Sequence, residues 1–157
     1  MPASKEDIVD AIRTADKEAE RLAASLTEAA WSTGVYEQGW NASQVLCHLA
    51  DGSQIAPFLI NLAKTPPKPL PPGAYFDLDA YNARQVAARQ GKPLSEIMGE
   101  LRNGHELSIE AVRAAPDELI AQHFRAPWGS EGPLGDIILE AIDHDMTHLR
   151  DLAGAVE

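Results

Sequence analysis

The chain contains five histidines, and two of them, His144 and His148, are four residues apart near its C-terminal end. On a helix, this spacing places both side chains on one face, one turn apart, where their imidazoles can bind the same ion. Zn²⁺ and similar divalent ions take imidazole nitrogens at about 2.0 to 2.1 Å. Spacing alone is weak evidence for a site, because such pairs also arise by chance on solvated helix faces.

The position of the histidines relative to apolar residues strengthens the metal hypothesis. His144 and His148 continue an apolar helical stripe, and His48 lies between Val45 and Ile55 in an earlier helical pattern. The stripe of the last helix consists of Leu134, Ile137, Ile138 and Ala141. Three inward imidazoles on two facing helices match catalytic metal sites, which have three protein ligands and one open position. Three separately hydrogen-bonded histidines are the alternative, and the residues alone leave both open.

Two further residues are candidates for proton transfer. His105 follows Leu101 by four on the inner face of its helix, where it would act as a general base, a fourth ligand or a hydrogen-bonded wall residue. Asp51 follows His48 by three and would either orient an imidazole or be a solvated acid. The residues that we expect to line a substrate pocket are Trp40, Tyr81, Asn82 and Trp128.

Helical periodicity accounts for most of the chain and predicts the elements that must position these side chains. Asn41 and Gln44 form a capping box for the helix that carries His48, and Pro57 should kink this helix. Gly34 and Gly39 mark the loop before it. The other helices are expected at 5–30, from Asp77 or Asp79 to about Gln90, from Pro93 to Ala115, and from Pro133 to Gly154.

The region between residues 66 and 72 contains five of the eleven prolines, so it is stiff and extended and cannot continue a helix. We interpret it as a long crossover between helices that run the same way. No alternating run of strand length occurs. The sequence therefore predicts a single all-α domain, residues 1–157, built as a four-helix bundle with a proline-rich crossover and one extra short helix.

Composition excludes several classes of protein. The 157 residues include 13 Lys and Arg against 24 Asp and Glu, a net charge of −11, and one cysteine. A single cysteine, Cys47, cannot form an intrachain disulfide and fits a reducing cytoplasm. Cys47 is next to His48 in sequence, but its side chain points about 100° away around the helix axis. We therefore expect it to pack as a small apolar residue. The acidic charge disfavours nucleic acid and membrane surfaces as partners. No apolar run approaches the ~18 residues of a membrane span, and no signal peptide is recognisable. We expect a soluble cytoplasmic protein with a small-molecule substrate.

Two motifs carry a resemblance to a known family. Residues 39–51 are Gly-Trp-Asn-Ala-Ser-Gln-Val-Leu-Cys-His-Leu-Ala-Asp, and residues 143–150 are Asp-His-Asp-Met-Thr-His-Leu-Arg. Together with the helix order and the long crossover, they resemble the DinB-like superfamily, which includes YfiT-type proteins, mycothiol-dependent maleylpyruvate isomerases and bacillithiol transferases. The resemblance implies an up-down-down-up bundle, a homodimer, and a divalent metal held by His48, His144 and His148.

The resemblance also implies a range of reactions. Members catalyse thiol transfer, isomerisation and hydrolysis, and the isomerase branch has a carboxylate at the position of His144. We therefore expect a metal-dependent thiol S-transferase or hydrolase that uses zinc, or else nickel, iron or manganese, and in the transferase case a low-molecular-weight thiol. A non-catalytic stress-response or binding protein with a structural metal is the alternative. The net charge of −11 argues against the DNA binding that the family name suggests.

Overall fold

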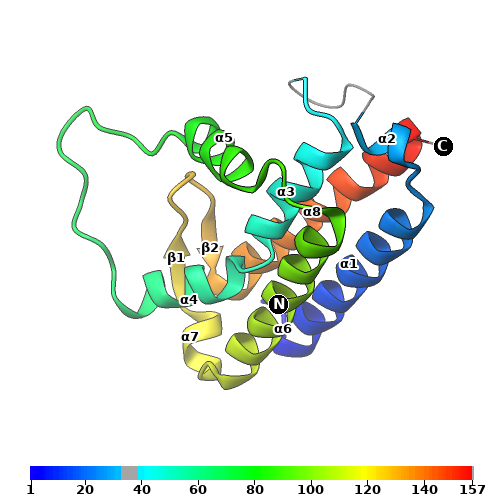
Figure 1. Ribbon diagram of the computed structural model, residues 1–157. Coiled ribbons are helices and arrows are strands. Elements are labelled where there is room, and N and C mark those ends of the chain that lie inside the picture. Colours follow the sequence, from blue (N-terminus) through cyan, green and yellow to red (C-terminus); the bar gives the residue numbers. More distant parts are fainter. Residues whose placement is uncertain (33–38, 157) are drawn as a thin grey trace.

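The computed structural model describes residues 1–32 and 39–156 and is predominantly helical (Figure 1). The helices are α1 (Lys5–Ser25), α2 (Glu28–Ser32), α3 (Ala42–Gly52), α4 (Ile55–Lys64), α5 (Leu78–Arg89), α6 (Leu94–Ala114), α7 (Asp117–Ala121) and α8 (Leu134–Val156). The strands are β1 (His123–Arg125) and β2 (Glu131–Pro133). This arrangement confirms the predicted all-α four-helix bundle with a crossover.

The first predicted helix is divided in the structure. It begins as expected, with Ser4 and Asp7 forming a capping box, but α1 ends before Leu26, whose backbone is extended. The reason is a second cap: the Thr27 hydroxyl accepts a hydrogen bond from the Ala30 N–H at 3.1 Å, which starts α2. The single helix predicted over 5–30 is therefore wrong in its last turn.

The helix predicted from Asn41 is divided as well. Asn41 and Gln44 form the expected capping box, with both side chain to backbone distances at 2.9 Å. The chain then breaks at Ser53 and Gln54, between α3 and α4, which confirms the predicted kink. Pro57 falls in the first turn of α4, where its missing N–H costs no helical hydrogen bond. Gly39, before this helix, has a φ of +88°, whereas Gly34 lies outside the described residues.

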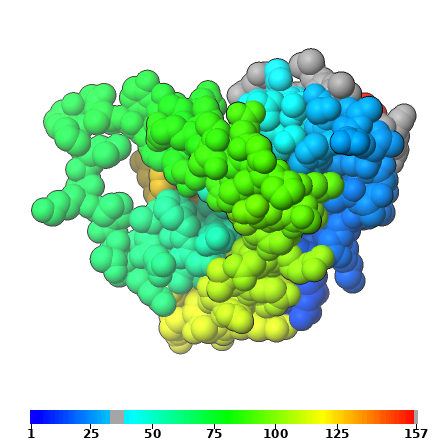
Figure 2. Space-filling view, viewed as in Figure 1, coloured from blue at the N-terminus to red at the C-terminus, as the bar shows by residue number. Residues whose placement is uncertain are grey.

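The proline-rich crossover is the most extended feature of the molecule. It joins α4 to α5 and stands away from the helical body in the space-filling view (Figure 2). Asp77 then caps α5 by accepting from the Ala80 N–H at 3.0 Å, and Gly91 turns the chain into α6 with a φ of +86°. The extra short helix and its boundaries thus agree with the sequence.

A small antiparallel hairpin precedes the last helix and corrects the expectation that no strand occurs. β1 pairs with β2 so that Phe124 lies opposite Gly132. Each strand has only three residues, which is too short to produce an alternating pattern. Helix α8 continues to Val156, past Gly154, where the sequence predicts its end.

The long helices run in the up-down-down-up order. In Figure 1, α1 and α8 rise from the lower to the upper end, whereas α3 and α6 descend. The largest fully buried side chains of the core, from these helices and from α4, include Ile8, Ile12, Leu46, Leu59, Ile97, Leu101, Leu134, Ile138 and Leu152. No helix among the described residues has both the length and the apolar character needed to cross a membrane.

Candidate metal centre

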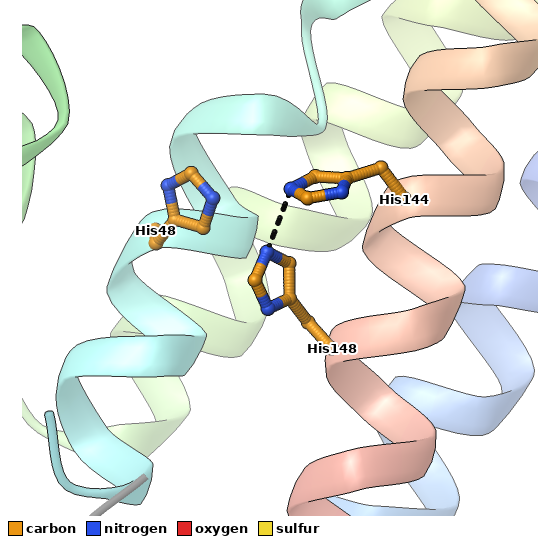
Figure 3. Close-up of side chains that lie close together, drawn as sticks. All are labelled: His48, His144 and His148. Carbon is orange, nitrogen blue, oxygen red and sulfur yellow. Dashed lines mark hydrogen bonds between the residues drawn. The ribbon is translucent and has the colours of Figure 1, made fainter. Parts of the chain in front are cut away.

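Three histidines from two helices meet beside the core (Figure 3). His48 comes from α3, and His144 and His148 come from successive turns of α8. One nitrogen from each ring lies within 4.8 Å of the other two. The Nε2 atoms of His144 and His148 are 2.9 Å apart, and the rings of His48 and His148 stand edge to face with centroids 5.2 Å apart. The structure therefore brings together the three residues that the sequence singled out.

The three rings differ in their exposure to solvent. His148 is buried and His48 is partly buried, but His144 is exposed, although its spacing placed it on the apolar face. The core stripe of α8 runs through Ile138 and Ile142, and His144 lies at the border of this stripe. The cluster therefore extends from the protein interior to the surface, with His144 at its solvent side.

The environment of His48 keeps this ring neutral. Burial, followed by the nearby His148 and His144, lowers the pKa of His48 to about 4. Its Nδ1 is buried without a hydrogen-bond partner in the described structure. The Trp40 ring covers it, with centroids 5.4 Å apart. A neutral imidazole offers the lone pair that a metal needs.

Asp51 lies three residues after His48 and belongs to a polar network with α5 and α6. Its Oδ1 is 3.6 Å from Nη2 of Arg89, and the Tyr81 hydroxyl donates a hydrogen bond to its carboxylate. Arg89 is in turn held by Glu100, 2.8 Å from its Nε. Burial raises the pKa of Asp51, while Arg89 and Tyr81 oppose this shift. Asp51 is thus a positioned carboxylate on the same helix as His48.

A second carboxylate, Asp145, lies against the same part of α3. A Cβ built on Gly52 would be 3.3 Å from Oδ2 of Asp145, so only glycine leaves room for this side chain without displacing it. The carboxyl group of Asp145 is enclosed, although the residue as a whole is half-buried. Its burial, and to a smaller extent the charge of Asp51, raises the pKa of Asp145 to about 8. Sequence spacing gave no sign of this contact between α3 and α8.

The remaining predicted site residues lie in different places. His105 does not join the three histidines: its Nδ1 is 2.8 Å from Oδ1 of Asp16, on the side of α6 that faces α1. Tyr81 contacts Asp51, as described above, and Asn82 is the next residue of α5. Trp128 is in the turn of the β1–β2 hairpin and packs against the core. Cys47 is a buried free cysteine whose pKa is raised by burial, in agreement with a packing role.

The three imidazole nitrogens suit a divalent transition-metal ion such as Zn²⁺. Imidazole nitrogens around a tetrahedral zinc are about 3.4 Å apart, given Zn–N bonds of about 2.0 to 2.1 Å. The nitrogens of His144 and His148 are 2.9 Å apart, and no two of the three nitrogens are more than 4.8 Å apart. Small rotations of the rings would therefore bring the nitrogens to the spacing that a tetrahedral ion needs. The buried and unpartnered Nδ1 of His48 is the kind of group that a ligand normally satisfies.

The helix order and the crossover define a four-helix bundle of the DinB-like class, and its three clustered histidines could hold a metal ion. Residues 12–153 match the family model described as the mycothiol maleylpyruvate isomerase N-terminal domain. The chain belongs to this family. A sequence comparison with curated proteins gives no match.

Solved structures agree on the fold. The mycothiol-dependent maleylpyruvate isomerase is 17% identical with a TM-score of 0.75, and the match covers 98% of this chain but 62% of that one. The chain thus spans less than two thirds of that enzyme. YfiT from Bacillus subtilis, described as a probable metal-dependent hydrolase with an unusual four-helix bundle topology, is 17% identical with a TM-score of 0.72, covering 96% of this chain and 85% of YfiT. An uncharacterised Clostridium difficile 630 protein is 10% identical with a TM-score of 0.73, covering 98% of this chain and 96% of that one.

Proposed function

We propose that the protein is a divalent-metal-dependent enzyme of the thiol S-transferase or hydrolase type, with His48, His144 and His148 as the metal ligands. The observation that supports this best is a cluster of three imidazoles whose outer ring, His144, is exposed. Catalytic zinc sites use three protein ligands and leave a position for water or substrate, whereas structural sites are closed by four. Within the described part of the chain, the cluster has no fourth protein ligand.

Zinc is the ion that we propose, because neutral imidazoles suit it well; nickel, iron and manganese are the alternatives. The chemistry that such an ion supplies is Lewis acidity, which turns a water or a thiol into a nucleophile near neutral pH. A low-molecular-weight thiol is the proposed co-substrate of the transferase, supported by the name of the mycothiol-dependent isomerase. The hydrolase alternative has its support in the description of YfiT.

The protein's own residues would orient the reactants and move the proton. Asp51 is the proposed general base, with a carboxylate oxygen as the proton acceptor, because burial raises its pKa toward the working range. Tyr81 and Arg89 are positioning residues that hold this carboxylate. Trp40, which lies over His48, would exclude water from that side of the ring.

Asp51→Asn tests the catalytic proposal. We expect turnover by the metal-loaded protein to fall by about 100-fold, since an amide cannot accept the proton, while metal affinity changes by no more than about twofold. The measurement is kcat/KM in thiol transfer with mycothiol and other small thiols, and in ester hydrolysis. Asp143→Asn, at an exposed residue beside His144, is the matched control and should retain activity.

Two outcomes of this experiment would contradict the proposal. Equal activities of Asp51→Asn and wild type would remove Asp51 from the mechanism. A metal-loaded wild type without turnover in either assay would instead favour the non-catalytic alternative, a binding or stress-response protein with a structural metal.

A further inference from the structure

A recess in the protein surface lies between α1 and α6, and its lining does not include the histidine cluster. It is open to solvent and has a volume of about 350 Å³, within the range of sites that bind small molecules. These two helices lie side by side in Figure 1 and form adjoining surfaces in Figure 2. None of the residues that line this recess belongs to the metal centre or to the Asp51 network.

Three cationic side chains line the recess: Arg13 and Lys17 from α1, and Arg113 from α6. Arg13 and Lys17 are four residues apart and so lie on one face of α1. Over the described ranges, none of the three side chains forms an ion pair with a carboxylate. In contrast, the basic residues that do form such ion pairs are Lys5, Arg21, Arg89, Lys92 and Arg102. Three exposed cations without a carboxylate partner thus share one recess in a chain with 24 acidic and 13 basic residues.

The acidic groups in the recess do not cancel this charge. The Oδ1 atom of Asp16 lies 2.8 Å from Nδ1 of His105, so this carboxylate accepts a hydrogen bond from the ring, which is only 10% exposed and lines the recess. Glu106 is the other carboxylate of the lining, and Ile109 provides an apolar wall. The recess therefore offers two guanidinium groups and one ammonium group against two carboxylates, of which Asp16 already accepts a hydrogen bond from His105.

We propose that this recess is a binding site for a small organic dianion, either a phosphomonoester or a dicarboxylate. Both present several anionic oxygens, which guanidinium groups bind through paired, charge-assisted hydrogen bonds. Arg13 and Arg113 approach the ligand from opposite helices, and Lys17 adds a third positive charge. The pair His105 and Asp16 forms part of the wall of the recess. The site is independent of the metal centre.

The test is calorimetric titration of the full chain with inorganic phosphate and, separately, with succinate. We expect saturable binding of at least one probe, and the tighter of the two identifies the class of ligand. The double variant Arg13→Gln/Arg113→Gln should bind at least about tenfold more weakly, because the loss of even one charge-assisted contact costs roughly this factor. Lys64→Gln/Lys68→Gln, which changes the net charge equally outside the recess, should bind as wild type.

Two single variants distinguish binding in this recess from damage to the fold and from binding at the histidine cluster. Glu106→Gln removes the unengaged carboxylate and should tighten binding, a change of sign that general damage to the fold does not produce. His144→Ala should leave anion binding unchanged, because its ring belongs to the other site. The proposal is overturned if neither probe saturates, if the double variant binds as tightly as the Lys64 and Lys68 control, if Glu106→Gln weakens binding, or if His144→Ala abolishes it.

Discussion

Replacement of His144 by alanine is expected to abolish the rise in Tm that a divalent ion gives the wild-type protein. A ligand that binds only the folded state at a thousand times its Kd stabilises that state by about 4 kcal/mol. For a domain of about 150 residues, this corresponds to a rise of about 10 °C. Without one imidazole only two ligands remain, so most of this rise should disappear. Thermal unfolding of protein purified without a nickel column, with and without Zn²⁺, measures the effect.

His144 is the most informative of the three ligands because its ring is exposed, so its removal costs little packing. His148 is 4% exposed, and His148→Ala should lower the Tm even without metal, since it leaves a void in the core. His123→Ala is the matched control: His123 is an exposed histidine, 2.8 Å from Glu131 on the hairpin, and should keep the full zinc response. An equal zinc response in His144→Ala and wild type would show that the histidine cluster is not the metal site.

Periodicity predicted the helices well because each long helix buries one continuous stripe. The division of the first helix at Leu26 was missed, because it depends on a Thr27 hydroxyl that competes with the helix for an N–H group. The hairpin was missed for a different reason. Its register pairs His123 with Pro133, and such short strands contain too few residues for a pattern.

The histidine cluster is predictable from the sequence, but its surroundings are not. Two histidines four residues apart on one helix, with a third on an apolar face of another, form a pattern that can be recognised in the sequence. The contact of His105 with Asp16 joins residues 89 positions apart, and nothing in the spacing of either helix indicates it. The same holds for Asp51 with Arg89. The apolar pattern of a helix shows which face is buried, but tertiary packing determines which neighbouring helix a polar side chain on that face contacts. The local sequence does not contain this information.

Substitution of Gly104 by alanine is expected to destabilise the protein by about 3 kcal/mol or more, because α6 packs tightly at this residue against the break between α3 and α4. A Cβ on Gly104 would be 1.8 Å from Oγ and 2.7 Å from Cβ of Ser53. Ser53 has little freedom to move: its hydroxyl donates to the Ala50 carbonyl at 2.6 Å, and its own carbonyl accepts from the Ser108 hydroxyl at 2.6 Å. The helices would have to separate.

Gly99→Ala on the same helix is the matched control. Gly99 is exposed and has open space at its Cβ position, so alanine should stabilise α6 by about 0.5 to 1 kcal/mol through helix propensity. Chemical denaturation of both variants measures the two effects. Ser53 follows His48 by five residues, so a separation of α3 from α6 should also displace His48. Gly104→Ala should therefore reduce the rise in Tm that zinc produces, whereas Gly99→Ala should not. Equal stabilities of the two variants would show that the close approach at Gly104 does not hold α3 in place.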